Sequence, residues 1–370
     1  MRGGEVFPHP RPLSAHPFLM VDLPDPKSVR RIAVRLTNWV GDCVMNTPFF
    51  HRLREIFPNA KVTAVGRKNV AMILKPHPDV NDVWAIDDST PAAFARTAAK
   101  LRTLNADIGF ILPNSIKTAA LFAAAGIPHR IGYNRDARRL LLTHPVTLRP
   151  EDLAVHEVRY YLRLLHFWEG DAKDPPPLRL MLTDEEKSQA EQWLRDHSVR
   201  ARQMVVGVNP AAIYGTAKRW LPERFAEVGA HFVREHDARI VVTGLQQEHP
   251  IAQQVCDAGG DGFINAAGKM KLRDLMAFIE RCQLFVTNDS GAMHVAAAFG
   301  TNLIAIFGST DWVTTAPLSS HARIVRVETP CAPCILRHCP IDHRCMTGVT
   351  AQRVIEEAED LLGSAARAGS

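Results

Sequence analysis

The sequence predicts an α/β protein made of two Rossmann-like, doubly wound parallel-sheet domains that face a cleft. Short apolar strands alternate with amphipathic helices along the chain, the pattern of parallel strands joined by crossover helices. The alternation stops at residues 171–182, where three consecutive prolines and no helical period indicate a linker, and then begins again. A length of 370 residues also exceeds what one ordinary core accommodates.

The N-terminal domain is predicted at residues 30–175, after a flexible leader at 1–29. Short apolar runs predict its strands, and runs with one apolar face predict its helices. The expected strands are 31–36, 61–66, 82–86, 107–112 and 129–133, and the expected helices are 44–57, 94–104 and 117–126.

The C-terminal domain is predicted at residues 176–350, with a final helix and tail at 351–370. Its first helix opens at Thr183, because Thr183 and Glu186 have the spacing of a capping box. The strands that follow are expected at 204–210, 238–244, 283–289 and 302–308, and the helices at 222–236, from Pro250, at 272–282, at 293–300 and at 350–362, with Thr350 as the last cap. Ligands of such sheets bind outside the carboxyl ends of the strands, so the cleft is the expected site.

Composition narrows the class of protein. The leader has prolines and histidines but no apolar segment of the signal-peptide type, and no run approaches the ~20 apolar residues that span a bilayer, so a cytoplasmic protein is expected. The formal net charge of +5 fits an anionic substrate or an anionic membrane surface and is too small to indicate nucleic acid. The sequence has no GxGxxG, GxxxxGK[ST], HExxH or GxSxG motif, which argues against dinucleotide dehydrogenases, P-loop NTPases, zincins and α/β-hydrolases.

The first segment that carries chemistry is TNWVGDCVMNTP, directly after the first strand. Gly41 permits a tight backbone turn, and Asp42 then falls near the start of a helix at the cleft edge of the sheet. An aspartate that only satisfies free helix amides would explain this position well, because such caps are frequent. A helix N-terminus also keeps the carboxylate ionised, which a general base requires.

The second segment, NPAAIYGTAKRW, follows the first strand of the second domain. Backbone amides in a loop of small residues, together with Lys218, suit a diphosphate. A solvated pair of Lys218 and Arg219 is an equally good interpretation of the local sequence.

The third segment, FVTNDSGAMHVAAAFG, is the most distinctive. A buried strand delivers Asn288, Asp289, Ser290 and Gly291 to the start of a helix, and His294 follows close behind. Small polar residues and a glycine at such a turn make a compact site for phosphate and hydroxyl groups. The alternative is a capped helix with a histidine that faces the core.

Four of the seven cysteines lie close together in the sequence, at Cys331, Cys334, Cys339 and Cys345. Their spacing could support a closed tetrahedral thiolate site for a structural metal, although it is not that of a standard zinc ribbon. Free thiols or a redox-sensitive pair are the alternatives in a reducing cytosol. No catalytic metal and no cofactor are expected.

Together these segments resemble the ADP-heptose:lipopolysaccharide heptosyltransferases, from about Arg31 to the last helix. The resemblance implies a GT-B arrangement of the two domains and inverting transfer. Such a transfer needs no catalytic metal if a lysine and backbone dipoles stabilise the charge on the leaving diphosphate. WVGDCVMNTP resembles the motif of the proposed catalytic base, which implies that role for Asp42. YGTAKRW resembles the motif whose lysine contacts the donor phosphates, which implies that Lys218 stabilises the leaving diphosphate. The resemblance implies a donor site of Tyr214, Gly215, Lys218, Glu248, Met270, Asp289, Ser290, Gly291 and His294.

The segment LPNSIKTAALFAAAGIPHRIGY and the cysteine cluster are similar to the enzymes that add the second heptose of the inner core. This implies ADP-heptose as donor, a heptosyl-Kdo-lipid A acceptor and a peripheral position on the inner face of the inner membrane. Acceptor contacts are expected from Asn114, Ser115, Lys117, Arg130, Arg135 and Arg138, since arginine binds carboxylates and phosphates well; a solvated basic surface is the alternative. A transferase with another sugar nucleotide, such as a UDP-linked amino sugar, and a catalytically silent nucleotide-sugar-binding protein remain rival functions.

Overall fold

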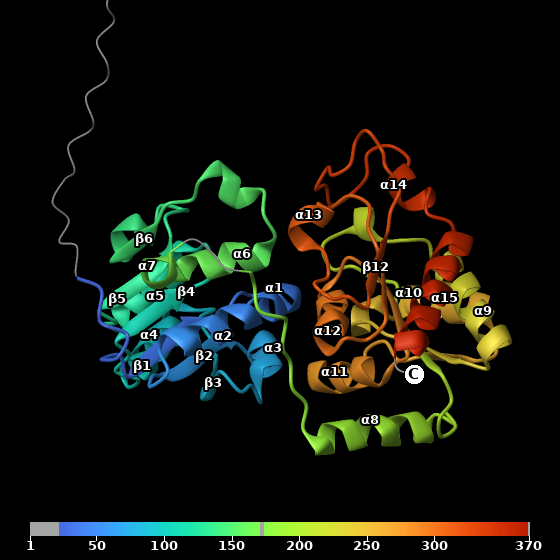
Figure 1. The fold of residues 1–370 in the computed structure, drawn as a ribbon, viewed down its shortest axis with the longest axis horizontal. Helices are drawn as coiled ribbons and strands as arrows, with labels where there is room; N and C mark the ends of the chain where they lie inside the picture. Colours follow the sequence, from blue (N-terminus) through green and yellow to red (C-terminus); the bar gives the residue numbers. More distant parts are fainter. Residues whose placement is uncertain (1–21, 171–173, 369–370) are drawn as a thin grey trace, which may run out of the picture.

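The computed structural model describes residues 22–170 and 174–368. It consists of two lobes, each built on a six-stranded parallel sheet (Figure 1). The strand orders are β3-β2-β1-β4-β5-β6 and β12-β11-β10-β7-β8-β9, so both sheets have the same doubly wound order. The predicted fold class is therefore confirmed. The predicted leader lies outside the described residues up to position 21, and Val29, near its end, is buried in the core.

The first lobe places helices on both faces of its sheet. Its strands are β1 Arg31–Arg35, β2 Lys61–Arg67, β3 Asp82–Ile86, β4 Ile108–Ile111, β5 His129–Tyr133 and β6 His144–Val146. Its principal helices are α1 Val40–Met45, α2 Thr47–Ile56, α3 Lys68–Ala71, α4 Pro91–Arg102, α5 Ile116–Ala124, α6 Glu157–Leu162 and α7 His166–Glu169.

The second lobe repeats the design after helix α8, Asp184–Asp196. Its strands are β7 Val205–Asn209, β8 Arg239–Val242, β9 Phe263–Asn265, β10 Leu284–Asn288, β11 Leu303–Ile306 and β12 Ala322–Val325. Its helices are α9 Pro222–His236, α10 His249–Gly259, α11 Leu272–Arg281, α12 Gly291–Phe299, α13 Trp312–Thr315, α14 Arg344–Thr347 and α15 Ala351–Ala368. The predicted capping box is present: the Thr183 side chain accepts from the Glu186 amide, and the Glu186 carboxylate accepts from the Thr183 amide.

Two central strand pairs determine where the site forms. β1 pairs with β4, and β7 pairs with β10, all in parallel register. In each lobe, the chain that leaves one strand of the pair crosses to one side of the sheet, and the chain that leaves the other strand crosses to the opposite side. A crevice opens between these two connections at the carboxyl ends of the strands. The loops that leave the carboxyl ends of these four strands include Asp42, Asn114, Lys218 and Asp289.

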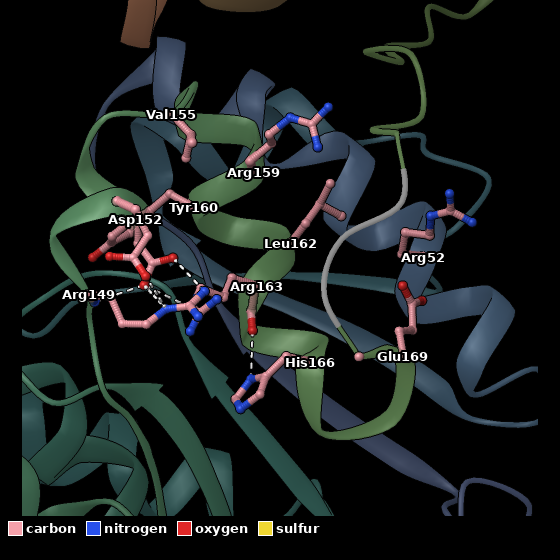
Figure 2. Close-up of a pocket in the computed structure, with 12 residues that line it drawn as sticks. Arg52, Arg149, Asp152, Val155, Arg159, Tyr160, Leu162, Arg163, His166 and Glu169 are labelled. Atoms are coloured by element: carbon pink, nitrogen blue, oxygen red, sulfur yellow. Dashed lines mark hydrogen bonds and ion pairs between the residues drawn. The ribbon is translucent and has the colours of Figure 1, made fainter.

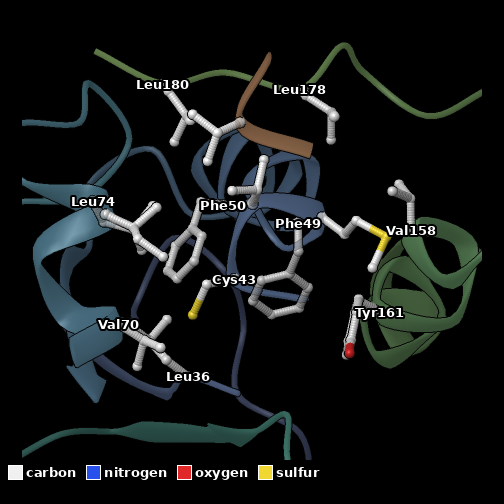
Figure 3. Packing of buried hydrophobic residues seen from close by; sticks show 14 of the residues in the cluster. Leu36, Cys43, Phe49, Phe50, Val70, Leu74, Val158, Tyr161, Leu178 and Leu180 are labelled. Atoms are coloured by element: carbon white, nitrogen blue, oxygen red, sulfur yellow. The ribbon is translucent and has the colours of Figure 1, made fainter. Parts of the chain in front are cut away.

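The first core is closed by the chain that leads to the second lobe. Phe49 and Phe50 of α2 belong to this core, and in Figure 3 Leu178 and Leu180 of the linker lie over them, on the side away from the strand at the bottom of the view. The Arg179 amide also donates to the Thr47 hydroxyl across 3.0 Å. The predicted proline-rich linker is thus fixed against the first lobe over the residues that follow the prolines.

The two lobes meet where α1 faces α12 (Figure 1). A side chain at Gly41 would place a Cβ 2.8 Å from Cδ2 of His294, and one at Gly291 would lie 3.0 Å from Cβ of Val40. His156 also forms a 2.8 Å hydrogen bond with the Ala316 carbonyl of the other lobe. The absence of two side chains therefore allows the helix starts to approach.

The structure departs from the predicted elements in several places. The helix expected at residues 44–57 is divided at Asn46, because Pro48 in the first turn of α2 starts a new helix. The segment before it, which includes Asp42, is already helical as α1. The strands β6, β9 and β12 were not predicted, since each has only three or four residues and little alternation to mark it.

Candidate active site between the lobes

Asp42 lies in the first turn of α1, at the carboxyl end of β1, and lines a cavity of about 460 Å³. Burial raises the pKa of Asp42 to about 6, while a backbone hydrogen bond and the charge of Lys218 lower it. Gly41 does not have the positive φ of a tight turn. Its lack of a side chain instead makes room for His294 of the other lobe. The carboxylate is therefore held at the boundary of the lobes.

Lys218 and Asp289 form the opposite side of the site. The Lys218 ammonium lies 2.6 Å from Oδ2 of Asp289, and the two side chains are only 16% and 7% exposed. Asn288 fixes the Lys218 loop, because its Oδ1 accepts from the Trp220 amide and its amide nitrogen donates to the Pro210 carbonyl. The segments that follow two strands, β7 and β10, thus meet at this ion pair.

The start of α12 completes this side. Ser290 caps the helix by accepting from the Met293 amide, and its hydroxyl lies 3.0 Å from that of Thr287. His294 is buried, and its Nδ1 has no hydrogen-bond partner among the described residues. Burial lowers the pKa of His294 to about 4, so its imidazole is neutral near pH 7. A neutral ring with a free nitrogen can form a hydrogen bond to a ligand without adding charge.

Glu157 is the residue that sequence analysis missed. It begins α6 and lines the same cavity as Asp42. Burial raises the pKa of Glu157 to about 7, the charges of Asp42 and Asp289 raise it further, and Lys218 lowers it. Its only sequence signal is an acidic residue in the first turn of a helix, which is common in proteins. The site therefore brings three carboxylates near one ammonium.

The cavity beside Asp42 belongs to the N-terminal lobe. Loops at the carboxyl ends of β1 and β4 and the start of α6 form most of its wall, and it is lined by Thr37, Asn38, Trp39, Asp42, Leu112, Pro113, Asn114, Ser115, Arg135, Asp152, Leu153, Val155, Glu157, Tyr160, Tyr161 and Thr314. Thr314 comes from α13 of the second lobe. The predicted acceptor residues Asn114 and Ser115 are therefore in the cavity with Asp42.

The predicted basic residues separate into two groups. Arg135 is exposed and lines the cavity, whereas Lys117 is exposed on α5, 3.9 Å from Asp88, and is not among the residues that line it. Arg138 is fully buried, where its guanidinium donates to the carbonyls of Pro113 and Tyr133 and to Asn114.

Arg130 has similar internal partners, since it donates to the carbonyls of Ile127 and Leu141. Arg130 and Arg138 thus hold this edge of the sheet together and do not face the cavity.

A second cavity of about 260 Å³ shares Asp152, Val155 and Tyr160 with the first. Figure 2 shows that Arg149 and Arg163 point at the Asp152 carboxylate; Arg149 lies 3.3 Å and Arg163 3.1 Å from it. The single carboxylate of Asp152 offsets one of these two positive charges, and Glu151, 3.2 Å from Arg149, offsets the other.

The donor loop, defined here as residues 214–218, is attached to the cysteine segment, residues 331–345. The Tyr214 hydroxyl donates to the Ile335 carbonyl at 2.9 Å, and the Ala217 amide donates to the Arg337 carbonyl at 3.0 Å. Gly215 lies so close to Arg337 that a Cβ would be 2.2 Å from its carbonyl oxygen. The position of Lys218 therefore depends on the cysteine segment.

Glu248 and Met270 flank the same carboxyl edge farther along the second sheet. Glu248 is buried in the loop after β8, where its carboxylate accepts from the Leu245 amide at 2.7 Å. Met270 follows β9 and is partly buried. The Gly268 amide donates to the Gly244 carbonyl at 2.9 Å, which brings the two loops together.

The four clustered cysteines surround one small cavity of about 80 Å³, together with Ala217 of the donor loop. The pKa of Cys345 is raised, first by burial and then by the charges of Cys331, Cys334 and Cys339. The sulfur atoms are not packed as a closed set of ligands: the one group of three or more candidate ligands within 4.8 Å in the described chain lies elsewhere. Both the metal site and the free thiols stay predictions.

Comparison with known proteins agrees with this arrangement. Residues 94–344 match the family described as glycosyltransferase family 9 (heptosyltransferase). Lipopolysaccharide heptosyltransferase 2 of Salmonella typhimurium is 30% identical over 348 residues, as is that of Escherichia coli, and each alignment covers 90% of this chain and 98% of the relative.

Solved structures show the same fold. Escherichia coli ADP-heptose lipopolysaccharide heptosyltransferase II superposes with a TM-score of 0.80 at 29% identity, over 90% of this chain and 99% of that chain. A family 9 glycosyltransferase from Veillonella parvula also gives a TM-score of 0.80, at 24% identity over 92% of this chain and 99% of that one, a likeness of fold alone.

Metal analysis tests the cysteine cluster. If the thiolates hold a structural metal, protein purified anaerobically without chelator should contain a zinc or iron ion bound by the clustered cysteines. Replacement of Cys334 and Cys339 by serine should abolish that ion, whereas replacement of the isolated Cys256 should leave it. Metal-free protein with four thiols that react with a sulfhydryl reagent in the folded state would instead establish the free-thiol interpretation.

Proposed function

The chain belongs to glycosyltransferase family 9, the heptosyltransferases, and we propose that it moves a heptose from ADP-L-glycero-D-manno-heptose onto the heptosyl-Kdo-lipid A inner core of lipopolysaccharide. Membership of this family makes the chain a glycosyltransferase that acts in heptose transfer to lipopolysaccharide. What we propose beyond this is the identity of the donor and of the acceptor, and inversion at the anomeric carbon. One observation carries it: α1, which holds Asp42, packs against α12 of the other lobe, and the Lys218–Asp289 ion pair adjoins the start of α12.

The donor diphosphate is assigned to Lys218 and the start of α12. An ammonium group and the amides of a helix N-terminus are favourable partners for phosphate. Asp289 holds the ammonium at 2.6 Å, which orients it before the donor arrives. Buried, neutral His294 supplies a ring nitrogen for a hydroxyl or phosphate oxygen. Glu248 and Met270 lie on the same sheet edge and are assigned to the ribose and the adenine.

Asp42 is assigned as the base. The acceptor oxygen attacks the anomeric carbon from the face opposite the diphosphate and forms the new C–O bond, while its proton passes to Asp42. The bond from the anomeric carbon to the diphosphate oxygen breaks, and its electron pair leaves with ADP. The raised pKa of Asp42, about 6, makes this carboxylate a stronger base than an exposed aspartate, yet largely ionised at neutral pH. Lys218 stabilises the charge that grows on the leaving group.

Glu157 is assigned to the acceptor side. With a pKa of about 7 it is partly protonated at neutral pH, so it can donate or accept a hydrogen bond with the acceptor sugar. Asn114, Ser115 and Arg135 line the rest of that cavity. Arg135 and Lys117 are the exposed basic groups for the carboxylates and phosphates of the acceptor.

A peripheral position on the membrane is part of the proposal. Within the described ranges, no helix has the length and hydropathy to cross a bilayer. Exposed apolar side chains lie at or next to the acceptor cavity, as Trp39 and Leu153 line it and Ile116 follows Ser115. Leu140 is 73% exposed beside the exposed Arg139. Apolar side chains with nearby basic groups suit an anionic lipid surface.

Transfer assays test the function directly. The enzyme should transfer heptose from ADP-heptose to a purified acceptor that already carries one heptose, and should give no product with the acceptor that carries none. Equal or better transfer to the acceptor without heptose would reassign the step. Turnover with a UDP-linked amino sugar, and none with ADP-heptose, would establish the rival transferase, and no turnover with any donor would leave a nucleotide-sugar-binding protein.

The Asp42→Asn variant tests the base. In the wild type, log kcat/KM should rise with pH through about 6 and then level off, because protonated Asp42 cannot accept a proton. The N-cap residue of α1 is Trp39 and not Asp42, and asparagine has nearly the shape of aspartate, so the variant should fold. It should lose roughly 10²–10⁴ in rate, together with the rise of kcat/KM with pH through about 6. Asp184→Asn, at the exposed start of α8, is the matched control and should be near normal. Near-normal turnover of Asp42→Asn would exclude Asp42 as the base.

Vesicle sedimentation tests the membrane position. Binding to vesicles with anionic lipid should be strong at low salt and reversed at high salt, because screened surface charges no longer attract. Arg139→Glu together with Leu140→Glu should weaken it, whereas Arg234→Glu on the other lobe should not. Absence of binding by the wild type at low salt would show that this surface does not meet lipid.

A further inference from the structure

Three candidate metal ligands converge on the far side of the second lobe, away from the cleft. His231 and His236 come from the last turns of α9, and Glu359 comes from the C-terminal helix α15. One ligand atom from each lies within 4.8 Å of the other two, and in the described parts of the chain no other group of three or more candidate ligands is so close. The helices that carry them pack against each other.

Both imidazoles point at the same place. Nε2 of His231 lies 2.8 Å from Oε1 of Glu359, and Nε2 of His236 lies 2.7 Å from the same oxygen. The direction in which an imidazole nitrogen donates its proton is also the direction in which its lone pair binds a metal after the proton is lost. A cation that replaced the two protons would therefore stand where both lone pairs already converge, with the carboxylate as third ligand.

Both rings contact the core. Phe232 is completely buried; His236 stacks on it with ring centroids 5.4 Å apart, and His231 meets it edge-on at 5.2 Å. Fixed ligands lose little freedom when a metal binds, which favours affinity. Glu359 is 36% exposed, so its carboxylate can move outward to make space for the ion, and water can reach the remaining coordination positions.

The chemistry of the ligands selects the ion. Two imidazole nitrogens and one carboxylate oxygen suit zinc and its transition-metal neighbours, whereas magnesium and calcium prefer oxygen ligands alone. The position adds to this preference, because His236 is the last residue of α9 and the C-terminus of a helix attracts a cation.

We propose that His231, His236 and Glu359 bind one transition-metal dication of the zinc class, which ties the C-terminal helix α15 to α9. The bound ion joins two elements that are otherwise held by apolar packing, chiefly of Val354, Ala358 and Leu361 in the second core. It lies apart from Asp42, Lys218 and the clustered cysteines, so it stabilises the lobe and takes no part in transfer.

Calorimetric titration with zinc chloride tests this site, with magnesium chloride as the comparison ion. The wild type should bind one zinc ion more than the His231→Asn, His236→Asn and Glu359→Gln variants, all of which keep the seven cysteines. Loss of an outer-sphere partner already costs roughly 10- to 100-fold in metal affinity, so loss of a ligand should cost at least that much. His321→Asn, an exposed histidine elsewhere on this lobe, should bind zinc like the wild type.

Hydrogen exchange gives an independent readout. Zinc should slow exchange of the amides in residues 351–368 in the wild type and in His321→Asn, and should leave exchange unchanged in the three ligand variants. Equal zinc binding by the wild type and the ligand variants, or zinc binding without protection of α15, would overturn the proposal. If one variant does not fold, the other two variants still test whether these residues bind zinc. The wild type also tests it, because zinc and not magnesium should protect the amides of α15.

Discussion

The rest of the site depends on the close approach of α1 to α12. Two helix starts from different lobes meet there, and they can do so because Gly41 and Gly291 have no side chains to keep them apart. This contact brings Asp42, in the first turn of α1, to the lobe that holds the Lys218–Asp289 ion pair, and it packs the buried His294 against Gly41. In the proposed function, the base Asp42 and the phosphate-binding Lys218 therefore come from different lobes.

Burial explains the electrostatics of the site. It raises the pKa values of Asp42 and Glu157 and lowers that of His294, because a charged form is less favourable away from water. The folded state therefore keeps one ammonium near three acidic groups, an arrangement that costs stability when all three are ionised. Such perturbed groups gathered in a cleft are typical of catalytic sites, where activity and stability compete.

Much of this structure could be predicted from residue patterns, and particular residues show where prediction stops. The strand-to-turn segments around Asp42, Lys218 and Asp289 were identifiable, because a parallel sheet brings the carboxyl ends of its strands to one edge. Glu157 was not, since its importance comes from neighbours far away in the sequence. Arg138 looked like a surface charge, yet it is fully buried on backbone carbonyls. The burial and the hydrogen-bond partners of such a residue depend on the tertiary structure, because the charge and hydropathy of its neighbours in the sequence do not show which groups it contacts.

The most direct test of the central claim is the pH dependence of kcat/KM in a Lys218→Met variant. Because the charge of Lys218 lowers the pKa of Asp42 across the lobe boundary, its removal should move the acid limb of the free enzyme from about 6 to a higher pH. Lys187→Met, which removes an exposed ammonium paired with Glu280, should leave the limb in place. If kcat/KM of Lys218→Met rises at the same pH as that of the wild type, the charge of Lys218 in one lobe does not influence Asp42 in the other.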